Sequence, residues 1–200
     1  MILRPEQLDA LREMVNIGVG QAAGVLNAML RSHIILRLPI VEVLAHAELK
    51  SRVAGLSKGI FSAVRIGFKG PFVGNASLIF PAASAAKLVV LLTDDDRGAT
   101  DMDAIKVGTL TEVGNIVLNG VMGAIGNELQ QRVYYSVPFY LEDPLGILLA
   151  GEALENKSDV IWIQTQFTVQ EHQVEGDIVI LFSAGSLEML ITAIDRVLEK

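Results

Sequence analysis

The sequence of 200 residues contains no cysteine. This absence excludes disulfides, thiolate metal sites and a cysteine nucleophile, and it agrees with a reducing compartment. Long apolar runs are missing too: none approaches the roughly 18 residues typical of a membrane span, and no basic and apolar leader pattern opens the chain. We therefore expect a soluble, cytoplasmic protein.

Clustered positive charge is also scarce. The 16 Lys and Arg residues are scattered among 23 Asp and Glu residues, which gives a formal net charge of -7. Proteins that bind nucleic acids neutralise phosphates with grouped basic side chains, so this distribution argues against that class. Apolar residues, by contrast, make up 51% of the chain, which is enough to build a packed core and argues against disorder.

Metal and nucleotide sites find little support. The spacing of the histidines is unlike that of metal ligands, and the three Asp residues at 94–96 lack the staggered ligands and final Glu of a calcium loop. Glycines at 18 and 20 do not follow a strand and lack the Lys-Ser/Thr of a phosphate loop. We expect no metal and no bound cofactor. The histidines are His33, His46 and His172.

One pattern is present twice, and the second copy lies 99 positions after the first. Each copy reads Glu, two residues, Asn, twenty-two residues, Pro. The copies consist of Glu13, Asn16 and Pro39, and of Glu112, Asn115 and Pro138. Such internal similarity indicates that two copies of one unit make the molecule. We expect a single pseudo-symmetric domain over 1–200, with repeats at 5–95 and 102–200 and a linker at 93–98.

Each repeat is predicted to fold as a helix, three strands and a helix. Apolar residues at helical spacing predict helices, and short runs rich in Val, Ile and Phe between turn residues predict strands. The predicted helices are 5–30, 81–92, 103–131 and 186–198, and the predicted strands are 34–44, 59–68, 72–80, 133–149, 160–169 and 178–182. This order favours an α+β fold in which the strands join edge to edge into one mainly antiparallel sheet of about six strands. Two long helices should pack on that sheet.

The Glu and Asn of each pair should point away from the core. On a helical wheel the apolar stripe of helix 5–30 occupies one side, and Asp9, Glu13, Asn16, Gly20 and Asn27 lie roughly 80 to 140 degrees from it. Residues three apart are neighbours on a helix, so the carboxylate and the carboxamide can act on one bound object. The second helix repeats this arrangement, with Glu112, Asn115 and Asn119 on its polar side.

The simplest alternative is that these side chains form a solvated helix face. A duplication copies solvated residues together with functional ones, so repetition alone indicates common descent before it indicates chemistry. The glycines of the two helices allow two interpretations as well, because each costs about 1 kcal/mol relative to Ala. They either permit close packing or leave a shallow surface for a partner, and we favour the partner at Gly20.

The doubled pattern, preceded by Asp9 in its first copy, resembles the signature of the CheC, CheX and FliY family of chemotaxis phosphatases. The resemblance covers nearly the whole chain. Two intact Glu and Asn pairs are typical of the CheC type, whereas CheX has a single site. A chain of 200 residues leaves no room for the additional flagellar-switch domain of FliY.

The resemblance implies dephosphorylation of the response regulator CheY, whose aspartyl phosphate and magnesium ion belong to that partner. Asn16 and Asn115 would then orient the attacking water, and Glu13 and Glu112 would pair with a lysine of the regulator. The family signature has Asp or Ser four residues before Glu, but the second copy has Gly108 there. We therefore expect the first site to be at least as active as the second.

The resemblance leaves two other functions open. The chain would be a non-catalytic adaptor if it bound the regulator, or the receptor deamidase CheD, without changing the lifetime of the phosphate. A third role, as a component of the flagellar switch, would require stable association with that assembly.

Overall fold

A computed structural model describes residues 3–30, 34–55, 59–93, 102–149, 159–169 and 172–199. The helices are α1 (Pro5–Leu30), α2 (His46–Gly55), α3 (Ala82–Thr93), α4 (Met102–Glu128), α5 (Leu145–Leu149) and α6 (Ser186–Leu198). The strands are β1 (Ile34–Leu44), β2 (Ile60–Lys69), β3 (Gly74–Pro81), β4 (Tyr134–Tyr135), β5 (Phe139–Pro144), β6 (Asp159–Val169) and β7 (His172–Phe182). His33, the three Asp residues at 94–96 and the rest of the predicted linker after Thr93 lie outside the described residues.

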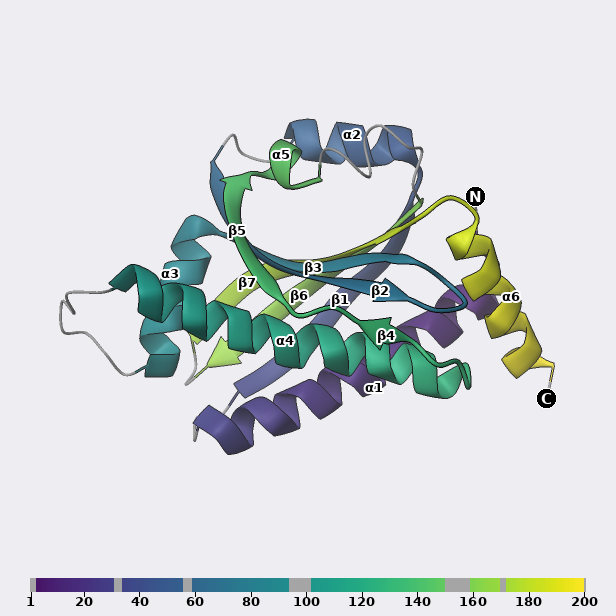
Figure 1. Cartoon of the computed structure of the whole chain (residues 1–200), viewed down its shortest axis with the longest axis horizontal. Coiled ribbons are helices and arrows are strands. Elements are labelled where there is room, and N and C mark those ends of the chain that lie inside the picture. The colour runs from purple at the N-terminus through teal and green to yellow at the C-terminus, as the bar shows by residue number, and fades with distance from the viewer. Residues whose placement is uncertain are drawn as a thin grey trace.

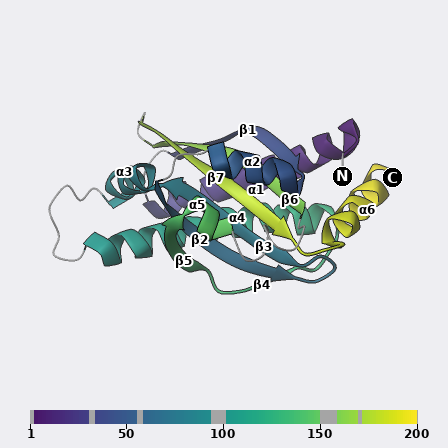
Figure 2. The same ribbon diagram turned by 90° about the horizontal axis from the view of Figure 1, so that it is seen from above.

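The strands form one antiparallel sheet in the order β1-β6-β7-β3-β2-β4, with β5 also paired to β2. The long helices α1 and α4 lie side by side against one face of this sheet, and the short helices α2 and α5 cover the other face (Figures 1 and 2). The predicted α+β class, with two long helices on a mainly antiparallel sheet, is confirmed. Strand β7 begins six residues before the predicted start at 178.

The two halves exchange their first strands. β1 of the first half pairs with β6 of the second, and β5 of the second half pairs with β2 of the first, while β3 and β7 meet at the centre. The prediction that the two strand sets simply join edge to edge is therefore wrong. Each half completes its share of the sheet with a strand from the other, so neither half holds a full set of backbone partners by itself.

A proline interrupts the outer strand at each edge of the sheet. Along β1, the step from Arg37 to Ile40 takes three residues while β6 advances two, and Pro39 lies in this bulge. Between β4 and β5, the step from Tyr135 to Phe139 takes four residues while β2 advances three, and Pro138 lies there. Proline has no N–H for a ladder, so edge bulges tolerate it. Both prolines of the repeated pattern therefore have a structural use at the edges of the sheet.

Two short helices were not predicted from the sequence, α2 and α5. Each follows the first strand of its half, so the repeating unit is helix, strand, short helix, two strands, helix. The run 133–149, predicted as one strand, divides into β4, β5 and α5. The last five residues of that run are four apolar residues and a glycine, and a run this short has no period that separates strand from helix.

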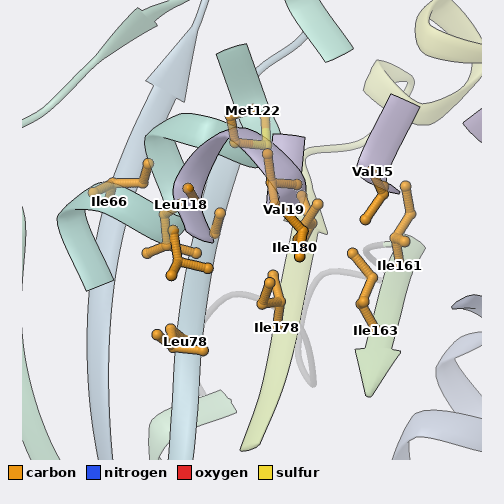
Figure 3. Close-up of a cluster of buried hydrophobic side chains, with 14 of the residues drawn as sticks. Val15, Val19, Ile66, Leu78, Leu118, Met122, Ile161, Ile163, Ile178 and Ile180 are labelled. Carbon is orange, nitrogen blue, oxygen red and sulfur yellow. The ribbon is translucent and has the colours of Figure 1, made fainter. Parts of the chain in front are cut away.

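The main core lies between the sheet and the long helices. Alternate residues of the central strands face it, among them Ile178 and Ile180 of β7 and Ile161 and Ile163 of β6, and all four are fully buried. The long helices contribute the other side of this core, with Val15 and Val19 of α1 and Leu118 and Met122 of α4 (Figure 3). The intervening residues, such as Trp162, face a smaller core beneath α2 and α5. Strands buried on both faces explain the nearly continuous apolar runs in the sequence.

Glycines bring the backbones of α1 and α4 into contact. A Cβ atom on Gly18 would lie 2.5 Å from the carbonyl oxygen of Gly120, and one on Gly120 would lie 2.7 Å from that of Gly18. Gly114 is equally constrained, because its Cβ would lie 2.5 Å from the side chain of Val64 on β2. At Gly20, Gly24, Gly108 and Gly123 an added Cβ would meet nothing within 4 Å. The packing interpretation is thus confirmed at Gly18, Gly114 and Gly120, while the partner surface expected at Gly20 stays a prediction.

We predict that Gly18→Ala lowers the free energy of unfolding by about 1–3 kcal/mol, because the added methyl group forces the two backbones apart. Gly24→Ala on the same helix is the matched control, and it should raise stability by about 0.5–1 kcal/mol, since its methyl group enters open space. Urea denaturation followed by circular dichroism measures both variants. Equal effects of the same sign would contradict this account of the helix contact.

Candidate functional site

The two Glu and Asn pairs lie on the long helices, away from the sheet. Glu13, Asn16 and Glu112 are exposed, and Asn115 is half-buried. The helices run in opposite directions, since the C-terminal part of α1, at Leu26, lies beside the N-terminal part of α4. The pairs thus lie on either side of the Gly18–Gly120 contact, the first toward the end of the helix pair at α6 and the second toward the end at α3 (Figure 1). The predicted outward orientation is confirmed, and the catalytic role of these residues stays a prediction.

The first pair has an open setting. Within the described part of the chain, the side chains of Glu13 and Asn16 take part in no hydrogen bond or ion pair. One turn before Glu13, the exposed carboxylate of Asp9 pairs with Arg12 at 3.3 Å. One turn after Asn16 stands Gly20, which adds no side chain to this surface. A partner can thus approach the carboxamide of Asn16 without displacing a neighbour.

The second pair is built differently, because Asn119 stands at the position equivalent to Gly20. Its side-chain NH2 donates to the carboxamide oxygen of Asn115 at 2.6 Å and to the backbone carbonyl oxygen of Asn115 at 2.8 Å. The sequence placed Asn119 on this face but gave it no role. The sequence does contain a sign of this bond. Asn119 comes four residues after Asn115, which is within hydrogen-bonding reach on a helix, and the equivalent position in the first copy is a glycine.

Gly108 lines a cavity of about 280 Å³ beside Glu112. The other walls are mainly apolar and come from α1, α3 and α4, including Leu26, Leu92 and Ile116. The missing Asp or Ser therefore leaves a recess next to the second carboxylate, where the first copy has the exposed side chain of Asp9. The expectation that the first site is at least as active stays a prediction.

Asn27 does not belong to the exposed face to which the helical wheel assigned it. Its side chain is half-buried and bonds both backbone groups of Ile34: the amide NH2 donates to the carbonyl at 3.1 Å, and the carbonyl oxygen accepts from the N–H at 2.5 Å. Asn27 therefore joins the end of α1 to the start of β1. The wheel could not show this bond, because the partner lies beyond the helix.

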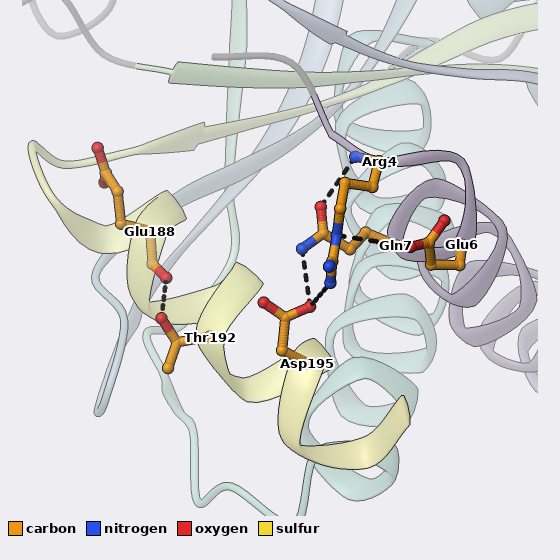
Figure 4. A network of polar contacts seen from close by, with 6 residues as sticks. All are labelled: Arg4, Glu6, Gln7, Glu188, Thr192 and Asp195. Atoms are coloured by element: carbon orange, nitrogen blue, oxygen red, sulfur yellow. Dashed lines mark hydrogen bonds and ion pairs between the residues drawn. The ribbon is translucent and has the colours of Figure 1, made fainter. Parts of the chain in front are cut away.

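A polar network fixes the start of α1, near the first pair. The side chain of Gln7 accepts a hydrogen bond from the backbone N–H of Arg4 at 2.9 Å and donates to Asp195 of α6 at 2.7 Å. Arg4 pairs with the same carboxylate at 2.5 Å and with Glu6 at 3.6 Å (Figure 4). Gln7 is only 5% exposed, so these bonds satisfy a buried amide. They hold α1 against α6 about two turns before Glu13.

A different network fixes α4 near the second pair. Lys106 forms an ion pair with Glu142 of β5 at 2.9 Å, and the hydroxyl of Tyr140 donates to the same carboxylate at 2.7 Å. The hydrogen bond from Tyr140, followed by that from Lys106, lowers the pKa of Glu142 below its usual value of 4.5. This cluster holds α4 on the edge of the sheet, less than two turns before Glu112.

The depressed pKa gives a stability prediction. A carboxylate with a lowered pKa in the folded state stabilises the fold above its unfolded pKa, and this contribution is lost as the pH falls through the folded pKa. Glu142→Gln should therefore lower the free energy of unfolding at pH 7 by about 0.2–1 kcal/mol, as expected for a partly exposed ion pair. The difference from the wild type should shrink as the pH falls below 4.5.

Urea denaturation at several pH values measures this difference. Glu128→Gln is the control, because Glu128 lies exposed at the far end of α4 and has no hydrogen-bond or ion-pair partner for its carboxylate among the described residues. A difference between Glu142→Gln and wild type that stays constant down to pH 3 would show that the carboxylate of Glu142 is not stabilised as described.

No group of three or more His, Asp or Glu side chains placed to hold a metal ion occurs in the described ranges. Over the same residues, no helix is both long and apolar enough to cross a membrane. The outer faces of α1 and α4 thus each present a carboxylate from Glu, a carboxamide from Asn and exposed backbone beside a glycine. Such groups can bind a cation, hold water and contact a partner, but by themselves they supply no strong nucleophile.

Comparison with known proteins gives a relative by sequence that covers most of the chain. No protein-family model matches the chain. The CheY-P phosphatase CheC of Bacillus subtilis (strain 168) is 28% identical over 180 residues, which cover 86% of this chain and 85% of the relative.

The solved structures that share the fold include the following three. FliY of Thermotoga maritima matches with a TM-score of 0.76 at 18% identity, covering 98% of this chain and 99% of its own. The FliM middle domain of H. pylori matches with a TM-score of 0.66 at 13% identity, covering 96% and 99%. The CheX-CheY-BeF3-Mg+2 complex from Borrelia burgdorferi matches with a TM-score of 0.54 at 16% identity, covering 84% and 97%. At these identities the similarity shows the fold alone.

Proposed function

We propose that this chain, which belongs to the CheC, CheX and FliY family, hydrolyses the aspartyl phosphate of the response regulator CheY. The observation that carries the proposal is the presence of two outward-facing Glu and Asn pairs at equivalent positions of the two long helices. CheC of Bacillus subtilis, which is similar to this chain in sequence, is a CheY-P phosphatase, and the similar CheX structure contains CheY. Both support a regulator as the substrate.

The asparagines are assigned to the attacking water. In-line attack on a phosphoryl group needs positioning more than covalent help, and a carboxamide offers a donor and an acceptor without a charge that would repel the phosphate. Asn16 is exposed and without a described partner, and so it can enter a partner's active site. Asn115 projects from the equivalent position of α4 and would act in the same way.

The glutamates are assigned to docking. A carboxylate close to a phosphoryl group would be repelled by it, so Glu13 and Glu112 suit a contact with a cation of the regulator better than the role of general base. One helical turn separates each Glu from its Asn, which allows both contacts to form with one bound regulator. The magnesium ion and the phosphoryl group belong to the regulator, and this chain would contribute two side chains per site.

We predict that the double variant Asn16→Ala/Asn115→Ala loses at least about 10²-fold in the rate of regulator dephosphorylation, because the water is no longer positioned. Each single variant should keep the activity of the remaining site. The decay of phosphorylated regulator, followed with radiolabelled phosphate, measures this rate. Gln21→Ala is the matched control, because it removes an exposed carboxamide from α1 outside the pair. A folded double variant with full activity would refute the mechanism.

We predict a different effect for the glutamates. In a protein with only the first site, made by Asn115→Ala, Glu13→Gln should raise KM roughly two- to five-fold and leave kcat nearly unchanged, as expected for the loss of one exposed ion pair. The increase should diminish at high salt, because salt screens exposed charges. Steady-state kinetics at two ionic strengths measure it. A loss confined to kcat would instead assign Glu13 to the chemical step.

A non-catalytic adaptor is the second candidate. The similarity to the FliM middle domain, which is closer in TM-score than that to CheX, supports it. An adaptor would co-elute with the regulator or with the deamidase CheD and leave the phosphate lifetime unchanged when present in catalytic amounts. The same decay assay, run with one molecule of this chain per hundred of regulator, separates the two functions.

A further inference from the structure

The second pair contains a third amide with a defined orientation. The NH2 of Asn119 lies 2.8 Å from the backbone carbonyl oxygen of Asn115, which can only accept a hydrogen bond. The nitrogen of Asn119 must therefore face Asn115, and its other proton donates to the side-chain oxygen of Asn115 at 2.6 Å. This pairing also settles the orientation of the Asn115 amide, whose oxygen faces Asn119 and whose NH2 faces away.

The first pair has no such contact. Position 20 corresponds to Asn119 and is glycine, and no described residue bonds the side chain of Asn16. Asn16 is exposed, whereas Asn115 is half-buried. The two carboxamides therefore differ in freedom before any partner arrives: Asn16 can rotate, and Asn115 is held.

We propose that Asn119 is a positioning residue that orients the carboxamide of Asn115 for the regulator, a role that rests on the proposed function. The bond uses one of the two lone pairs of the Asn115 oxygen. The second lone pair and the NH2 group stay available for water and for the phosphoryl group. Because the side chain is ordered in advance, docking of the regulator at the second site costs less conformational entropy.

At the first site the full entropy cost of ordering Asn16 arises when the regulator docks, because Gly20 has no side chain that could hold Asn16 beforehand. The proposal therefore predicts a difference in KM rather than in kcat, since the Asn side chain becomes ordered when the regulator docks. The expected size is about two- to ten-fold, which is the usual cost of immobilising one side chain. A pair that only stabilises the helix would change neither constant.

The test uses proteins with a single working site. In the Asn16→Ala background, which leaves the second site, Asn119→Ala should raise KM for phosphorylated regulator about two- to ten-fold with kcat unchanged. Asn119→Gln, which can still donate, should restore most of the loss. Asn119→Asp should not, because a carboxylate cannot donate to the oxygen of Asn115.

The reciprocal change should improve the first site. In the Asn115→Ala background, Gly20→Asn should lower KM by a similar factor, because a side chain at this position enters open space. Gly20→Ala is the control that separates the carboxamide from the effect of replacing a helical glycine. A fall in KM with Asn but not with Ala supports the proposal. The same fall with both residues would overturn it.

A second measurement keeps this proposal separate from the phosphatase assignment. Relaxation of side-chain amide signals by NMR, without any regulator, should show Asn115 more ordered than Asn16, and Asn119→Ala should remove the difference. The affinity for regulator activated with beryllofluoride should also be higher for the second site than for the first, and Asn119→Ala should remove this difference. If order and affinity change as expected while no variant hydrolyses phosphate, the positioning role stands and the phosphatase function fails.

The proposal is overturned by two further results. One is a decrease of KM in Asn119→Ala, which would mean that the regulator must break the hydrogen bond between Asn119 and Asn115 in order to bind. The other is an Asn115 amide whose order and regulator affinity do not change when Asn119 is truncated.

Discussion

The contact between the backbones of α1 and α4 at Gly18 and Gly120 determines most of what this molecule can present to a partner. The two helices form one closely packed layer, and their shared face covers the sheet. Their outer faces then carry the two Glu and Asn pairs, one on either side of this contact. Any shift at the crossing would move both pairs at once, because no flexible connection lies between the contact and either site.

Polar contacts complete this arrangement, and they differ between the two ends. Asp195 of α6 holds the start of α1 through Arg4 and Gln7, while Lys106 ties α4 to Glu142 on the sheet edge. The halves thus kept the same helical frame while their surroundings diverged. Asp9 faces solvent at one end, and Gly108 borders an apolar recess at the other. The chemistry proposed for the pairs depends on the two packed helices that carry them. The residues around each pair are what would make the two sites differ in activity.

Sequence patterns predicted the elements with strong periods, and they failed where pairing between distant segments decides the structure. Helix 5–30 and strand 34–44 were predicted with the observed bounds, because a long apolar stripe and a bounded β-branched run each have one solution. The exchange of β1 and β5 has no local signature. The same limit applies to the site: the outward direction of Glu13 followed from helical geometry, whereas the bond of Asn27 to Ile34 needed the fold.

The strand exchange also governs how the protein must form. Ile34 pairs with Val169, so β1 has no partner strand until most of the chain has left the ribosome. Contacts between such distant residues slow folding and leave strand edges exposed in the meantime. The bulge at Pro39 lies on the strand that waits longest, and a bent, proline-containing edge is a poor template for other chains. In the folded sheet, Pro39 thus makes the free edge of β1 less suited to pairing with a strand of another molecule.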